Sequence, residues 1–464
     1  MTGRKLLTII GVVCASLLIA PTTEAQQSKA RVTFITPNTF FLEAPWALLD
    51  NVNDDVFWVI RGSGFLSTDE KYEFWKVDGT KLFDAEWEKT YSDQPIFNSG
   101  VVPMRRPSEN IMRKGNICLL YTDGKIKDLN VRWDKVTNFK DGVAVVMPSM
   151  GSGEAFYIDT TGKRIYPNIK VDGYGFNIIR PLRDGMRAYK AYGSEWGYID
   201  ANGVVKLSPK YKDARDFSEG YAWVRMEDGT QQLIDKTGKS VFKASSGAGR
   251  TSDVVDGRFY VDEGSSTCYY DVKGNKLDCF DSGNQFYGGY AFVSRPKDFG
   301  DVNTLLIDTD MKIVREIPWT LVDVGMVSEK EPIFTSSGLA NVNNHNIGGN
   351  SYLLKPNADI ALAGYENNRD IVMSINEFKP VSDCGYFVAN INIEVDAWSR
   401  LNGRAVIKTT GEVVMIVSED KGFVRSYGPG YPVRQSDLDA NGGSFTIKAL
   451  DISQPSVSKK ASVK

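Results

Sequence analysis

The chain has 464 residues, and its 55 lysines and arginines against 58 aspartates and glutamates give a formal net charge of −3 at pH 7. This near balance excludes nucleic acid as the main partner, because phosphate binding requires a basic surplus or a basic stripe. The only histidine, His345, lies in an asparagine-rich loop at 341–350 and is interpreted as a solvated loop residue. A multi-histidine metal site is therefore excluded, and any histidine-based catalytic group would depend on one residue.

Residues 1–25 have the layout of a secretory signal peptide. Arg4 and Lys5 precede an apolar run at 6–20, and small residues follow at the two positions that a signal peptidase reads. The run is short for a membrane span, and no later run reaches spanning length. We expect a mature chain that begins at Gln26, has no membrane span and is secreted or periplasmic; a retained N-terminal anchor is the alternative.

A glycine followed by an apolar stretch recurs from about residue 100 onward. In the clearest copy, Phe217 and two variable residues precede Gly220, and the stretch 221–224 follows. These anchor glycines are Gly100, Gly142, Gly185, Gly220, Gly257 and Gly289, with weaker copies at Gly338 and Gly385. Their mean spacing of about 41 residues indicates a repeat architecture.

A second signal runs in phase with the first. Two apolar stretches flank a polar turn that has Asp at its first position and Gly at its fourth, as in Asp159 to Gly162. Further turns of this form end at Gly203, Gly238 and Gly274, with weaker versions at Gly79, Gly124 and Gly411. This chemistry suits a type I turn followed by a left-handed glycine, which closes a β-hairpin.

Together the two signals predict a unit of at least three strands, which buries its apolar face only against neighbouring units. No amphipathic helix of ten or more residues is evident. We therefore predict an all-β domain of about nine tandem, degenerate repeats over residues 31–450, followed by a disordered tail at 451–464. A propeller is favoured, and an open β-repeat array is the alternative because nine units exceed the usual number of blades.

One repeat carries a specific motif, Trp196-Gly197-Tyr198-Ile199-Asp200-x-x-Gly203, followed by Tyr211, Phe217 and Gly220. It resembles the WG-repeat family of bacterial secreted and envelope proteins, and degenerate likeness extends over roughly residues 50–425. The resemblance implies a secreted or envelope-associated β-repeat protein. It implies no catalytic residue, because the family shares none.

No nucleophile elbow or phosphate loop is present, so we predict no enzymatic activity. We predict an extracytoplasmic binding or scaffold protein that presents a β-repeat surface to a protein partner, whose binding residues are unknown. Glycan binding through exposed aromatic side chains is one alternative, since 11% of residues are aromatic. A hydrolase with paired carboxylates in a propeller's central channel is the other.

One stretch near the C-terminus has the spacing of a calcium loop. Asp437, Asp439 and Asn441 place oxygen ligands at alternate positions before Gly442. Lys448 stands where such a loop needs its closing glutamate, and an ordinary Asx-rich turn explains the same residues. We predict no cofactor or metal apart from this calcium candidate.

The cysteines raise one structural question, because Cys268 and Cys279 flank a predicted hairpin. A two-residue loop would set them directly opposite each other, at a separation that a disulfide accepts. A three-residue loop would instead set Cys268 opposite Asp278. The sister repeats favour the second register, so we predict no disulfide here, and we assign no partner to Cys118 or Cys384.

Overall fold

The computed structural model describes residues 31–36, 39–43, 52–61, 71–90, 94–108, 115–130, 135–148, 154–169, 179–190, 195–296, 302–317, 334–344, 350–363, 373–396 and 399–418. The predicted signal peptide, His345, the calcium candidates Asp437, Asp439 and Asn441, and the predicted tail lie outside these residues. Regular structure in the described part is entirely β, as predicted. No helix there has the length and hydrophobicity needed to cross a membrane.

The described strands form nine sheets, which we number in chain order. Sheets 1 to 3 comprise β3 (Val56–Arg61) and β4 (Lys71–Lys76); β5 (Glu88–Lys89), β6 (Val101–Arg105), β7 (Ile117–Tyr121) and β8 (Ile126–Asp128); and β9 (Lys135–Val136), β10 (Val143–Met147), β11 (Phe156–Asp159) and β12 (Arg164–Ile165). Sheets 4 to 6 comprise β13 (Arg187–Lys190), β14 (Trp196–Ile199) and β15 (Val205–Tyr211); β16 (Asp213–Ala214), β17 (Tyr221–Arg225), β18 (Gln231–Asp235) and β19 (Ser240–Lys243); and β20 (Arg258–Glu263), β21 (Ser266–Asp271) and β22 (Lys276–Phe280). Sheets 7 to 9 comprise β23 (Ser282–Gly283), β24 (Tyr290–Pro296), β25 (Val302–Asp308) and β26 (Ile313–Ile317); β27 (Ala340–Asn344), β28 (Asn350–Leu354) and β29 (Ile360–Ala363); and β30 (Met373–Asn376), β31 (Tyr386–Asp396), β32 (Ser399–Lys408) and β33 (Val413–Ser418), joined by β1 (Arg31–Thr36) and β2 (Thr39–Glu43).

Sheets 1 to 8 are local antiparallel meanders, as the two sequence signals predict, whereas sheet 9 also contains the N-terminal strands β1 and β2, with β2 parallel to β33. In sheet 5, β17 is the apolar stretch after the anchor glycine, and it pairs with β18, the first arm of the hairpin. The second arm, β19, pairs with β18 on the other side. A short strand before the anchor, β16, adds a fourth strand along the opposite edge of β17.

The anchor glycine is half of a two-residue turn. Ser218 and Tyr221 exchange two backbone hydrogen bonds of 2.8 and 3.0 Å across Glu219 and Gly220. Glu219 has φ 49° and Gly220 has φ 90°, the pair of left-handed residues that a type I′ turn requires. The weaker copy at Gly338 uses a longer turn, in which the Gly338 amide donates to the Thr335 carbonyl at 2.9 Å.

The hairpin turns also have the geometry that the sequence predicts. The Gly162 amide donates to the Asp159 carbonyl at 2.8 Å, and Gly162 has φ 78°. The Asp159 carboxylate accepts the amides of Thr161 and Lys163 at 2.9 and 3.0 Å. Asp at the first position thus stabilises the turn, because its side chain accepts the amides of the turn.

The prediction that Cys268 and Cys279 do not bond is wrong, since they form a disulfide. The predicted three-residue loop is present, with the Asp271 amide donating to the Asn275 carbonyl at 3.1 Å. A β-bulge then inserts one extra residue in the second arm, which moves the register by one and sets Cys268 opposite Cys279. An irregularity at the same place recurs in sheets 4, 5, 7, 8 and 9. Cys118 and Cys384 are free.

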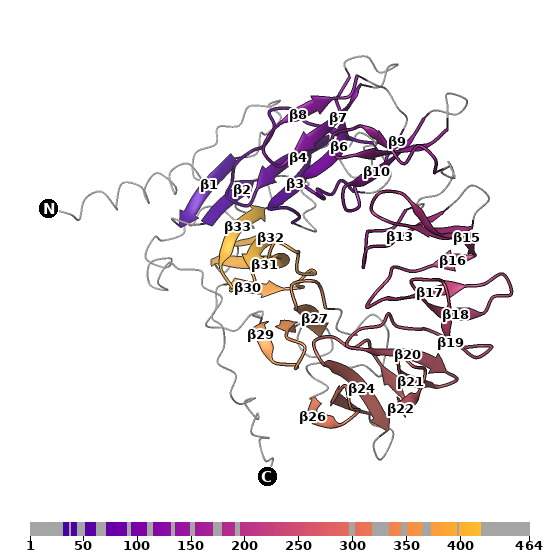
Figure 1. Ribbon diagram of the computed structural model, residues 1–464. Coiled ribbons are helices and arrows are strands. Elements are labelled where there is room, and N and C mark those ends of the chain that lie inside the picture. The colour runs from indigo at the N-terminus through magenta and orange to yellow at the C-terminus, as the bar shows by residue number, and fades with distance from the viewer. Residues whose placement is uncertain are drawn as a thin grey trace, which may run out of the picture.

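Apolar side chains fill the spaces between consecutive sheets. Along β17, Ala222 and Val224 pack against sheet 4, while Trp223 points to the opposite face and packs against sheet 6. Eight hydrophobic clusters of the described residues join sheets 1 to 9 in order, and a ninth joins sheet 9 to sheet 1. Figure 1 shows this propeller-like succession, with β33 beside β2 and β3. The join of first and last sheets consists of side-chain packing, because sheet 1 contains no strand from the C-terminal part.

We predict that Gly220→Val lowers the free energy of unfolding by about 1–3 kcal/mol, because a β-branched residue is strained at φ 90°. A Cβ at this position meets no atom within 4 Å, so strain in the backbone is the cause and crowding is not. Gly220→Asn should cost less, since asparagine tolerates the left-handed region. Urea unfolding of both variants checks this, and equal losses would contradict it.

We predict that Cys268→Ser with Cys279→Ser lowers the stability of the chain by about 2–3 kcal/mol, the value for a cross-link that closes a loop of this length. Dithiothreitol should lower the melting temperature of the wild type to about that of the double variant, and it should leave the melting temperature of the double variant unchanged. Calorimetry with and without reductant measures both, and a wild type insensitive to reductant would refute the prediction.

Candidate functional site

The signature residues of the WG motif lie at the join between sheets 4 and 5. Tyr198 is fully buried, and its ring packs edge-on against Phe217 and Tyr211 at 4.8 and 6.3 Å between centroids. Its hydroxyl donates to the Arg215 carbonyl at 2.7 Å. These three aromatic residues of the signature therefore connect two sheets and offer no surface to a ligand.

Asp200 and Gly203 shape the hairpin turn of the same repeat. The Asp200 carboxylate accepts the amides of Asn202 and Val204 at 2.9 and 3.0 Å. Gly203 has φ 77°, and a Cβ there would overlap the ring of Tyr166 from sheet 3. This glycine is thus needed both for its backbone conformation and for the room it leaves.

Gly197 is needed because the next strand approaches closely. A Cβ at this position would lie 2.7 Å from the Leu207 carbonyl oxygen and 2.9 Å from the Pro209 nitrogen, where β15 is irregular. The corresponding residue of sheet 6 is Cys268, whose side chain forms the disulfide with the neighbouring strand. At this position of the motif, sheet 4 therefore has a close backbone approach of its last strand, and sheet 6 has a disulfide to its last strand.

The segments that precede the anchor turns form what we call the inner edge. They contact one another from sheet to sheet: Thr90 Oγ1 donates to the Val136 carbonyl at 2.7 Å, and Arg215 Nη1 donates to the Thr251 carbonyl at 2.7 Å. The last strands of the sheets are exposed instead, as in β8 and β26. The inner edge is polar, and it is the side on which neighbouring sheets converge.

Acidic residues beside the anchor glycines join consecutive repeats. Asp256 Oδ2 accepts the Gly289 amide at 2.8 Å, and Asp184 accepts the Gly220 amide. Glu219 accepts the amides of Asp256 and Gly257, both at 2.8 Å. The analysis of the sequence missed this role, although the signal, an acidic residue directly before the glycine, is visible at several anchors.

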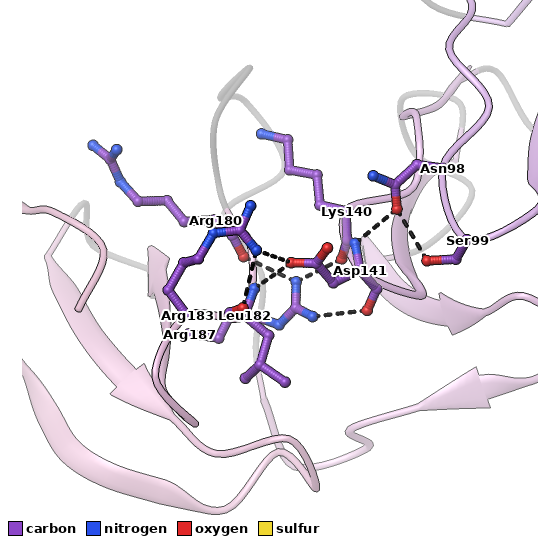
Figure 2. Close-up of polar contacts among 8 residues, drawn as sticks. All are labelled: Asn98, Ser99, Lys140, Asp141, Arg180, Leu182, Arg183 and Arg187. Carbon is purple, nitrogen blue, oxygen red and sulfur yellow. Dashed lines mark hydrogen bonds and ion pairs between the residues drawn. The ribbon is translucent and has the colours of Figure 1, made fainter. Parts of the chain in front are cut away.

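A buried arginine closes the join between sheets 3 and 4, as Figure 2 shows. Arg187 is 1% exposed and donates to the carbonyls of Lys140, Arg180 and Asp141 at 2.7, 2.9 and 3.0 Å. Burial lowers the pKa of the Arg187 guanidinium from its ordinary value. The three carbonyls and nearby Asp141 stabilise the charge, while Arg187 Nε is buried without a partner.

A group of charged side chains extends from this join along the inner edge; we name Lys140, Arg180, Arg183, Asp213, Arg215, Asp216 and Asp253 the inner cluster. The Arg180 guanidinium lies over the Trp196 ring, with its Cζ 5.3 Å from the centroid. Arg180 Nη2 is 3.6 Å from Asp213 Oδ1, and Arg215 Nη1 is 3.8 Å from Asp253 Oδ1. Asp216 Oδ1 is buried without a hydrogen-bond partner.

Burial raises the pKa of the Asp216 carboxyl. The positive charges of Arg180 and Arg183 oppose that shift, and the negative charge of Asp253 adds to it. Burial likewise raises the pKa of Asp253, although its side chain is 42% exposed. The inner cluster is the candidate site because it combines these carboxyls with the guanidinium of Arg180, whose nearest carboxylate among the described residues, that of Asp213, is 3.6 Å away.

Two other kinds of site were open from the sequence. Among the described residues, no group of three His, Cys, Asp or Glu side chains is placed to hold a metal ion. The large hydrophobic side chains that are exposed in the described part are all aliphatic.

We predict that Asp216→Asn stabilises the folded chain at pH 7. A carboxyl whose folded-state pKa is raised contributes stability at low pH and loses it as the pH rises through that pKa. The neutral amide avoids this loss, so the gain should shrink as the pH falls toward about 4. Melting temperatures between pH 7 and pH 3.5 measure it.

Asp235→Asn is the control of opposite sign. A hydrogen bond from Thr237 holds the pKa of Asp235 below its usual value, so its contribution is present at pH 7 and is lost as the pH falls. This variant should be less stable than the wild type at pH 7 only. A gain for Asp216→Asn that does not change with pH would contradict the assignment.

Comparison with known proteins supports the motif directly. Residues 196–229 match the family model described as WG containing repeat, and no curated protein matches the chain. Partial likeness, at 11% identity, extends to BamB from Moraxella catarrhalis (72% of this chain, 96% of that chain, TM-score 0.33) and to a eukaryotic initiation factor (87%, 92%, TM-score 0.39). The WD40 β-propeller domain of Doa1 is similar over 63% of this chain and 87% of that chain, also at 11% identity, with a TM-score of 0.26. The family match confirms the predicted resemblance: residues 196–229 of this chain form a WG-containing repeat.

Proposed function

We propose that the chain is an extracytoplasmic, non-enzymatic scaffold that presents its repeat surface to a protein partner. The observation that carries this proposal is the character of the exposed apolar side chains. Ile126, Val205, Leu277, Ile313 and Val314 lie on last strands of their sheets, Val204 directly precedes one, and they are 38 to 53% exposed. Exposed aliphatic groups along repeated strands suit contact with protein.

The disulfide supports the proposed location. Cys268 and Cys279 are joined, and disulfides persist in oxidising compartments such as the periplasm or the cell exterior. The predicted signal peptide at 1–25 leads to the same compartments.

The test is capture of partners from an extract of the envelope by the mature chain, with bound proteins quantified by mass spectrometry. We predict that Val205→Lys and Ile313→Lys reduce capture of a specific partner by about tenfold, because a charge replaces apolar contact. Lysine is tolerated on exposed edge strands, so both variants should fold.

Ile96→Lys is the matched control, since Ile96 is 36% exposed but lies outside the last strands. Equal losses for all three variants would contradict a partner surface on the last strands. Specific binding on a glycan array, abolished by changing one aromatic residue, would replace the protein partner with a sugar.

A carboxylate-based hydrolase is the second candidate, because Asp253 lies near enough to Asp216 for its charge to raise the pKa of Asp216. Turnover of a glycoside that Asp216→Asn or Asp253→Asn abolishes would establish it.

A further inference from the structure

Arg180 is oriented by the signature tryptophan, while its two Nη groups remain available for hydrogen bonds. Its guanidinium stacks on Trp196, and its contact with Asp213 at 3.6 Å is too long for a direct hydrogen bond. The Nε atom is buried without a partner, so a ligand from solvent reaches only the two Nη atoms. Among the described residues, the Arg180 guanidinium donates no hydrogen bond, which is unusual for a group with five donors.

The inner cluster around Arg180 contains four cationic side chains and three carboxylates, so an anion that binds Arg180 competes with Asp213. Figure 2 shows Lys140 and Arg180 extending away from the hydrogen-bonded group around Arg187. The side chains of Arg180 and Arg183 are 32% and 55% exposed, so a ligand from solvent reaches them. The free oxygen of Asp216 is buried and out of reach of such a ligand.

We propose that Arg180, oriented by Trp196, binds a carboxylate of an acidic segment of the protein partner. This rests on the proposed function and names the chemistry of its partner. A planar guanidinium matches a carboxylate through two parallel hydrogen bonds, and stacking fixes the plane in which they form. Lys140, which donates to the Ile179 carbonyl, and Arg183, which pairs with Asp141, add positive charge to the same cluster. The incoming carboxylate takes the position that Asp213 approaches only at long range.

The proposal gives the tryptophan of the repeat motif a role beyond packing. Trp196 is 7% exposed and is part of the core between sheets 4 and 5. Its ring face also carries Arg180 at the inner edge, so one residue connects the repeat core with the recognition group.

The test is calorimetric titration of the mature chain with hexaglutamate at low ionic strength. We expect binding that Arg180→Ala weakens by about tenfold or more, the loss of a charge-assisted bidentate pair. Arg180→Lys should also bind weakly, because an ammonium group forms no planar fork. Arg164→Ala is the matched control: Arg164 also stacks on a ring, with its Cζ 4.7 Å from the Phe156 centroid, but it lies on β12, a last strand.

Hexalysine and inorganic phosphate are the other arms of the titration. Binding of hexalysine in place of hexaglutamate, binding of phosphate as tight as that of the peptide, or equal losses in Arg180→Ala and Arg164→Ala would each overturn the proposal. Circular dichroism and melting temperature check that the variants fold. If Arg180→Ala does not fold, Arg180→Lys still tests the proposal.

Failure here is separable from failure of the proposed function. Capture of a partner that depends on Val205 and Ile313 but not on Arg180 leaves the scaffold function intact and removes the anion site. Hexaglutamate binding that depends on Arg180, without any captured partner, keeps the anion site and removes the scaffold function.

Discussion

Burial of apolar side chains between neighbouring sheets is the interaction on which the rest of this structure depends. Each sheet has few and short strands, so it cannot form a core alone. Its central strands are buried on both faces, as Ala222 and Trp223 show by packing against sheets 4 and 6. Every sheet therefore needs two neighbours, and the cluster of Phe57 with Val406 supplies the missing neighbour at both ends of the series.

Hydrogen bonds of polar groups at the turns fix the positions of consecutive repeats relative to one another. Left-handed pairs such as Glu219 and Gly220 reverse the chain in two residues, which keeps the strand before the anchor in register with the strand after it. Carboxylates beside the glycines then accept amides of the next repeat, as Asp256 does from Gly289. Buried Arg187 satisfies three carbonyls at one join, where an apolar residue would leave them without donors.

These constraints divide the surface into parts with different chemistry. The inner edge, where sheets converge, is polar and carries the charged inner cluster. The last strands diverge, and they expose aliphatic residues such as Val205 and Ile313. A partner that contacts both parts would use apolar contact for affinity and the Arg180 guanidinium for orientation.

The sequence by itself determined the repeats, their hairpin turns and the left-handed glycines, because these depend on local backbone chemistry. Asp159 and Gly162 reveal their turn through residue type and spacing alone. The sequence did not determine the register of Cys268 and Cys279, since a bulge depends on how a strand fits against its neighbour. Only the tertiary structure brought Arg180 onto Trp196 and next to Asp213, because these residues come from separate segments whose approach depends on packing between sheets.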